Sequence, residues 1–195
     1  MNVFTMSGDA LTPVFCKDEG RELQTALEKN LNLLPGDQIE PDDPRRWLIV
    51  KREMPVPDPA SGSDRWSLDF LLADQSAVPT LVECKRFLDP RSRREVVAQM
   101  LDYAANGPFY WTRDQLRDMA AEAARKDNRD LESALRELNP PEELQSPDKF
   151  FEQFWANLRK GEVRLVFFLE ASSHDLRSVA DFLNTQMKDA DVLVV

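Results

Sequence analysis

The chain has 195 residues, of which 35 are acidic and 25 basic, and its formal net charge is −10 at pH 7. This length suits one domain over residues 1–195 with a sizeable buried core and room for a helical insertion. No apolar run approaches the roughly 20 residues of a membrane span and the N-terminus lacks a signal peptide, so we expect a cytoplasmic protein without a membrane partner.

Cysteine and histidine are too scarce for a disulfide framework or a typical zinc site. The chain has two cysteines, Cys16 and Cys84, and a single histidine, His174, to which we assign no role. A metal ion, if one binds, should therefore be a hard ion held by carboxylates.

The N-terminal third is predicted to contain short strands, one helix and a longer strand. Residues 2–15 favour one or two short strands, and residues 46–55 favour a strand that a turn at 58–64 follows. Between them, residues 19–34 favour a helix with Asp18 as its cap and Pro35-Gly36 as its stop. The buried stripe of that helix would contain Leu23, Leu27, Leu31 and Leu34.

A β-hairpin is predicted over residues 65–85. Apolar and polar residues alternate in its first half, and AspGlnSerAlaVal at 74–78 forms a plausible turn. Pairing that is symmetric about Ser76 would put Leu71 opposite Leu81 and Asp69 opposite Glu83.

That register would place Asp69, Glu83 and Lys85 on one face of the hairpin. Opposed carboxylates repel each other, and their burial costs more unless something compensates the charge. A Mg²⁺ ion would resolve both problems, because it favours oxygen ligands from one or two carboxylates and water. The alternative is an ordinary solvent-facing Glu-x-Lys with an exposed aspartate nearby. Cys84, on the opposite face, would be a small core residue.

A helix is predicted to follow the hairpin, with Asp89 as N-cap and Pro90 at its first position. Gln99 and Tyr103 are one turn apart at the border of its apolar stripe, so they should project together. Asn106-Gly107-Pro108 is predicted to end this helix.

The remainder of the chain is predicted to be helical and then to return to strands. Residues 112–138 have helical periodicity, and a further helix should begin at Ser146-Pro147. A buried strand at 163–170, a helix at 176–187 and a strand at 192–195 would complete a β-α-β unit. The predicted fold class is α/β, a mixed sheet flanked by helices, with an all-helical insertion at about 110–160. The apolar end of the chain indicates either a paired terminal strand or a piece of a longer protein.

The pattern D-x13-E-x-K, followed by a helix with Q-x3-Y, resembles the PD-(D/E)xK nuclease superfamily, which has the restriction-endonuclease-like fold. The segment REVVAQMLDYAA is similar to the corresponding helix in the branch of NucS-like domains of uncharacterised bacterial proteins. The resemblance covers about residues 18–105, with a weaker match in the last strand and helix.

This resemblance implies a role for each matching residue. Asp69, Glu83 and the backbone carbonyl of Cys84 would bind Mg²⁺ or Mn²⁺. Lys85 would orient or activate the attacking water and stabilise the transition state, and Gln99 would touch the scissile phosphate or the metal-bound water.

Many members of the superfamily also carry an acidic residue on the first helix. Glu19 leans toward the buried stripe and Glu22 falls at its border, whereas the position expected from the family is occupied by Gly20. Glu19 is the preferred candidate for a metal ligand and Glu22 the alternative. An acid at a helix start is also favoured by the helix dipole alone.

DNA is the expected partner, and a homodimer is compatible with the sequence. The acidic net charge argues against broad coating of DNA, but basic residues gather next to the predicted site. This cluster would bind the DNA backbone locally together with Tyr103, or it is a solvated helix face. Its members are Lys85, Arg86, Arg91, Arg93 and Arg94.

Two functions therefore follow from the sequence. The first is a Mg²⁺-dependent DNA endonuclease or phosphodiesterase, which the intact Asp, Glu and Lys set favours. The second is a catalytically silent nuclease-like module that binds nucleic acid or a protein partner, which the acidic charge favours.

Overall fold

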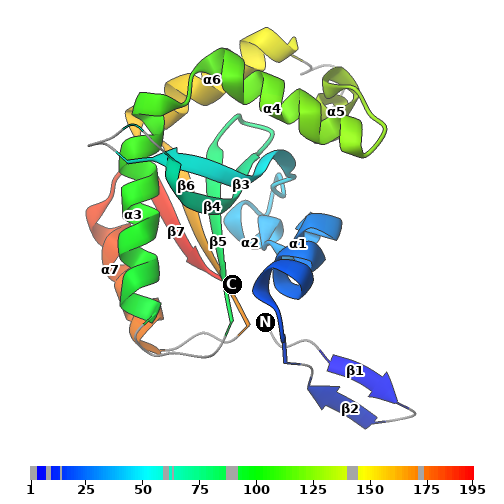
Figure 1. The fold of residues 1–195 in the computed structure, drawn as a ribbon, viewed down its shortest axis with the longest axis vertical. Coiled ribbons are helices and arrows are strands. Elements are labelled where there is room, and N and C mark those ends of the chain that lie inside the picture. Colours follow the sequence, from blue (N-terminus) through cyan, green and yellow to red (C-terminus); the bar gives the residue numbers. More distant parts are fainter. Residues whose placement is uncertain are drawn as a thin grey trace.

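The structure is a computed structural model, and it describes residues 4–7, 10–13, 15–58, 62, 64–86, 92–139, 145–170 and 174–195. Its centre is a five-stranded mixed sheet with the order β3-β4-β5-β6-β7 (Figure 1). The first three strands are antiparallel, and β5, β6 and β7 run parallel to one another. The predicted α/β class with a mixed sheet is confirmed. The strands are β3 (Leu48–Pro57), β4 (Asp64–Ala73), β5 (Pro79–Lys85), β6 (Val163–Leu169) and β7 (Ala190–Val194).

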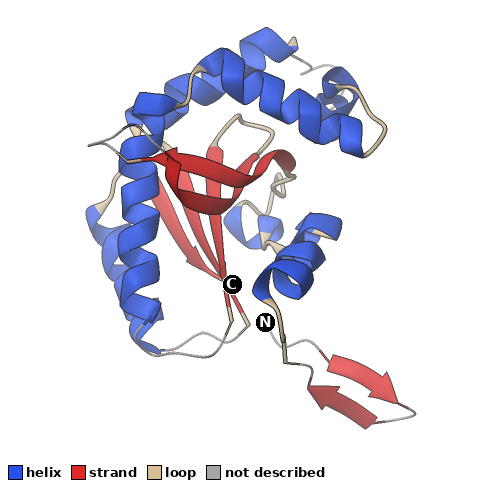
Figure 2. Cartoon of the chain, viewed as in Figure 1, coloured by secondary structure: helices blue, strands red, loops and turns tan. Residues whose placement is uncertain are grey.

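Helices cover both faces of this sheet (Figure 2). One face packs against α3 (Ser92–Tyr110), α4 (Arg113–Lys126), α5 (Leu131–Leu138), α6 (Pro147–Lys160) and α7 (His174–Gln186). The other face packs against the N-terminal segment, which contains η1 (Glu19–Gln24), α1 (Thr25–Lys29), η2 (Leu31–Leu33) and α2 (Gly36–Ile39). A separate antiparallel pair, β1 (Phe4–Ser7) and β2 (Ala10–Pro13), precedes them.

The predicted buried strand is β6, and its apolar run reflects burial on both faces. Leu165 and Phe167 belong to the core under α3–α7, whereas Val166 and Phe168 belong to the core under η1 and α1. Alternate side chains of a strand point to opposite faces, so a strand covered on both sides needs no polar positions.

The predicted single helix over residues 19–34 is wrong, because this segment is divided into shorter helices of different types. The segment begins as the π-helix η1, continues as α1, and ends at Lys29, where Asn30 leaves the helical region with φ −147° and ψ 81°. The predicted capping is confirmed, because the Asp18 side chain accepts a hydrogen bond from the N–H of Arg21. Leu23, Leu27 and Leu34 are buried as expected.

The predicted stop at Asn106-Gly107-Pro108 is also wrong, because α3 continues to Tyr110 with Pro108 inside it. Its predicted N-cap, Asp89-Pro90, lies outside the described residues. Gly107 serves the packing of Trp111 instead of ending the helix. A Cβ at Gly107 would lie 2.3 Å from the Trp111 ring, and this ring is held in place by a hydrogen bond from its Nε1 to the carbonyl of Pro55 at 2.9 Å.

Gly107→Ala is therefore expected to destabilise the protein by about 1–3 kcal/mol, the usual cost of overpacking. Gly20→Ala is the matched control, because a Cβ there would meet nothing closer than 3.7 Å. Urea unfolding of the two variants tests this. Equal stabilities would show that Trp111 does not pack on Gly107.

Candidate functional site

The hairpin of β4 and β5 has the predicted register, with Leu71 opposite Leu81 and Phe70 opposite Val82. The Asp74 carboxylate closes the turn by accepting hydrogen bonds from the N–H groups of Ser76 and Val78, each at 2.9 Å. One position beyond the Phe70–Val82 pair, the Asp69 carboxylate accepts the N–H of Cys84 at 2.6 Å. The register thus brings Asp69 to the segment that carries Glu83 and Lys85.

Both acids of the hairpin are buried, with 6% of Asp69 and 3% of Glu83 exposed. The Lys85 ammonium lies 2.9 Å from Glu83 Oε1. The other oxygen, Glu83 Oε2, is buried and has no hydrogen-bond partner among the described residues. The alternative of an exposed Glu-x-Lys is therefore wrong for Glu83, which is buried and paired with Lys85.

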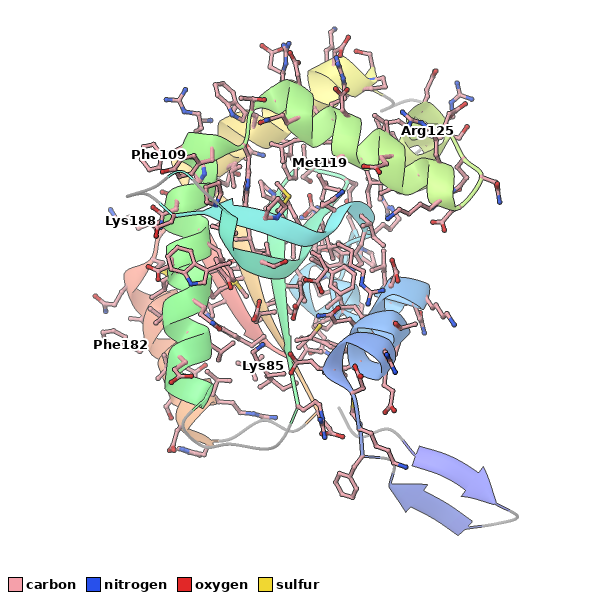
Figure 3. All side chains as sticks on the ribbon, viewed as in Figure 1. Lys85, Phe109, Met119, Arg125, Phe182 and Lys188 are labelled. Carbon is pink, nitrogen blue, oxygen red and sulfur yellow. The ribbon has the colours of Figure 1, made fainter. Side chains whose placement is uncertain are left out.

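Of the two candidate acids in the N-terminal segment, the structure brings Glu19 to the hairpin. Its carboxylate lies 3.2 Å from Lys85 Nζ and accepts the N–H of Arg86 at 3.1 Å. Glu22 instead accepts the N–H of Lys17 at 2.8 Å. Figure 3 labels Lys85 near the end of β5, between α3 and the N-terminal segment, both of which contact this strand.

The pKa values of Asp69, Glu83 and Lys85 are all raised, the first two mainly by burial and the third by the neighbouring carboxylates. Burial and the nearby Glu83 raise the pKa of Asp69 from 3.8 to about 7. Burial also raises the pKa of Glu83, although Lys85 opposes this effect. Burial alone would lower the pKa of Lys85, but the carboxylates of Glu83, Glu19 and Asp69 raise it above its usual value. Lys85 is therefore a permanent cation between anionic groups.

Two further predicted site residues, Gln99 and Tyr103, lie on α3. Tyr103 is buried on α3, and its hydroxyl donates to the carbonyl of Ser67 at 3.4 Å. Its pKa is raised mainly by burial and, to a smaller extent, by the negative charge of Glu83. Gln99 lies half-buried one turn earlier on the same helix. The structure places Tyr103 near the acids but gives Gln99 no hydrogen bond to them among the described residues.

The predicted basic cluster is described only in part. Arg86 is half-buried beside the acids, and its Nε has no hydrogen-bond partner among the described residues. Arg93 and Arg94 lie in the first turn of α3, and Arg91 lies outside the described residues. The side chain of Cys84 packs in the core under η1 and α1, as predicted.

Sequence reasoning missed Gln24 and Arg52. The Gln24 side chain is buried and donates from Nε2 to Asp69 Oδ1 at 2.7 Å, and Arg52 donates to Gln24 Oε1 at 3.2 Å. Gln24 is three residues before the buried Leu27, so a polar residue within the helical stripe was the available signal. Nothing in the sequence connected Arg52, on β3, with the site.

Within the described part of the chain, no three His, Cys, Asp or Glu side chains form a group that could hold a metal ion. Mg²⁺ needs only one or two carboxylates, with water as its other ligands, and Asp69 and Glu83 are two such carboxylates. Glu83 Oε2, which no described residue hydrogen-bonds, fits such an ion, since a cation would satisfy it.

A groove of about 620 Å³ lies elsewhere, between the N-terminal segment, β3, α4 and α5. Asp69, Glu83 and Lys85 do not line it, although Arg52 and Glu28 do. The groove is therefore separate from the acidic site. None of the described helices is both long enough and apolar enough to cross a membrane.

Comparison of the chain with protein-family models, with curated proteins and with solved structures gave no significant match to any of the three.

Proposed function

We propose that this protein is a Mg²⁺-dependent DNA nuclease of the PD-(D/E)xK type with a restriction-endonuclease-like fold. The observation that carries the proposal is the buried pair Asp69 and Glu83. The Lys85 ammonium lies 2.9 Å from one Glu83 oxygen, and the other has no hydrogen-bond partner within the described part of the chain. Two buried acids and one cation leave a negative charge that a divalent ion would neutralise.

Asp69 and Glu83 would hold the ion, whereas Glu19 pairs with Lys85 beside them. When bound, Mg²⁺ lowers the pKa of a coordinated water and polarises the phosphoryl oxygen. Lys85 supplies a fixed positive charge where negative charge develops on the phosphate. Arg86, half-buried and directly after Lys85 in the chain, would be a cation for a neighbouring phosphate of the backbone.

A silent binding module is the second candidate, and one observation favours it. Lys85 already bridges Glu83 and Glu19, so the site neutralises part of its charge without an ion. A protein that uses this arrangement only for stability would gain little from Mg²⁺.

Thermal melting in Mg²⁺ or Mn²⁺ separates these candidates. An ion at 100 times its Kd that binds only the folded state adds about 2.7 kcal/mol, which corresponds to a rise of roughly 5–10 °C for a chain of this size. Asp69→Asn should abolish the rise. Glu22→Gln, which changes an acid outside the site in the same way, should retain it.

Two outcomes would contradict metal binding at Asp69. An equal rise in wild type and Asp69→Asn would show that the ion binds elsewhere. No rise in wild type at any millimolar concentration would favour the silent module.

A further inference from the structure

The Asp69 carboxylate is held at both of its oxygens by donors from different parts of the chain. Gln24 Nε2 donates to Oδ1 at 2.7 Å from η1, and the N–H of Cys84 donates to Oδ2 at 2.6 Å from β5. A short hydrogen bond to each of the two oxygens fixes the plane of the carboxylate. With only one such bond, the carboxylate could still rotate.

Gln24 can play this part because η1 is a π-helix. Successive residues of an α-helix differ by about 100°, so Glu19 and Gln24 would lie about 140° apart on it. The wider turn of a π-helix, whose hydrogen bonds span five residues, brings positions five apart toward one side. Glu19 thereby reaches Lys85 while Gln24 reaches Asp69.

Arg52 determines which end of the Gln24 amide faces Asp69. Its Nη2 donates to Gln24 Oε1 at 3.2 Å and to the carbonyl of Gly20 at 2.8 Å, so the amide oxygen points to Arg52 and the NH₂ group points to Asp69. Arg52 is itself fixed by Glu28, at 2.5 Å, and lies over the Phe70 ring. A guanidinium suits this task because it presents several donors in a rigid plane.

We propose that Gln24, oriented by Arg52, is a positioning residue that holds the Asp69 carboxylate in one orientation. The importance of this orientation for a metal ion rests on the proposed function. Residues that orient a ligand typically change metal affinity by about 10–100-fold when they are replaced.

The N–H of Cys84 reports on the Asp69 orientation without any metal. In ¹H–¹⁵N NMR spectra of the metal-free protein, Gln24→Met should move the Cys84 amide proton upfield. The same substitution should also speed the hydrogen exchange of this amide about tenfold or more, because the Asp69 oxygen that accepts from it is no longer held in line with the N–H bond. Arg52→Met should have the same effect, and the double variant should add nothing to Gln24→Met. Gln24→Asn is a second variant in case Gln24→Met folds poorly. It keeps the amide, but its side chain is one methylene too short to reach Asp69.

Lys51→Met is the matched control. Lys51 lies on β3 next to Arg52, and it too pairs with a glutamate, Glu122 at 3.4 Å, but among the described residues it makes no hydrogen bond to Gln24 or Asp69. This variant should leave the Cys84 amide unchanged.

Titration with Mn²⁺ completes the test, and the expected result is a 10–100-fold loss of affinity in Gln24→Met. An unchanged Cys84 amide in Gln24→Met and Gln24→Asn would overturn the positioning role, even if wild type binds Mn²⁺. Additive effects of the two methionine substitutions would also overturn it, since Arg52 would then act independently of Gln24. If wild type binds no Mn²⁺, the proposed function fails, while the Cys84 amide still decides the positioning role.

Discussion

Replacement of Lys85 by alanine is expected to reduce Mg²⁺-dependent cleavage of DNA by a factor of about 10²–10³. Lys85 is the cation whose ammonium contacts both Glu83 and Glu19, and the surrounding carboxylates keep it charged. A preorganised charge of this kind acts on the transition state more than on the bound substrate, so the loss should appear in kcat.

The thermal shift by Mg²⁺ should survive in Lys85→Ala, because the carboxylates that would hold the ion remain. Glu83→Gln should lose both cleavage and the shift. Removing one partner of a buried ion pair can destabilise the fold, so Lys85→Gln, which keeps a donor for Glu83, is a second variant. Melting curves of both variants show whether a loss of rate is a loss of folded protein.

Lys51→Ala is the matched control for Lys85→Ala. Both side chains are similarly exposed, 28% for Lys51 and 26% for Lys85, and both pair with glutamate. Only Lys85 contacts the acids of the site. Equal loss of cleavage in the two variants would contradict a specific role for Lys85. Absence of cleavage in wild type, on single- and double-stranded DNA at low salt, would favour the silent module.

The second expected result concerns the metal-free protein, in which Asp69 should make stability fall as pH rises from about 4 to about 7. The pKa of Asp69 is raised by burial and by Glu83 to about 7 in the folded state, against 3.8 for the ordinary side chain. The folded state therefore holds a proton that the unfolded state has lost. This contribution is fully present below the unfolded pKa and disappears as pH rises through the folded one.

Its size is at most about 4 kcal/mol, from the difference between 3.8 and about 7 at 1.36 kcal/mol for each pKa unit. Because Asp69 and Glu83 interact, the apparent pKa values belong to the pair. Other carboxyls act in the opposite direction; for example, a hydrogen bond from Gln75 lowers the pKa of Asp43. The difference between wild type and Asp69→Asn isolates the contribution of the site.

Asp69→Asn should be slightly less stable than wild type near pH 4, since an amide offers one acceptor to the two donors Gln24 and Cys84. As pH rises toward 7, the stability of wild type should fall relative to that of Asp69→Asn. At pH 7 the variant should be at least as stable as wild type. Urea unfolding in the presence of a chelator measures both values. A stability difference that does not change with pH would show that Asp69 titrates normally, and saturating Mg²⁺ should reverse the order in favour of wild type.

The sequence by itself determined the elements whose contacts are local or periodic. The turn of the hairpin lies within five residues, and its strands alternate with period two. Together these place Leu71 opposite Leu81 and bring Asp69 to the segment of Glu83 and Lys85. The nearly continuous apolar run of β6 likewise indicates a strand that is buried on both faces, because alternate side chains point to opposite faces and apolar ones occupy both.

The end of α3 could not be predicted, because Gly107 is a typical helix stop in isolation. Its meaning depends on Trp111, whose ring needs the space of the missing Cβ and whose indole N–H is held by Pro55 on β3. Tertiary packing here outweighs the local preference of Gly and Pro to end a helix.

The tertiary structure alone decided how the buried acids are surrounded. Periodicity leaves Glu19 and Glu22 as alternatives, because the pattern predicts an α-helix where the chain forms a π-helix. That wider turn directs Glu19 to Lys85 and Gln24 to Asp69, and Arg52 arrives from a strand 28 residues later in the chain than Gln24. Contacts between residues so far apart depend on how η1 packs against β5. A sequence pattern fixes the residues on each face of an element, and only the packing of the elements fixes which faces meet.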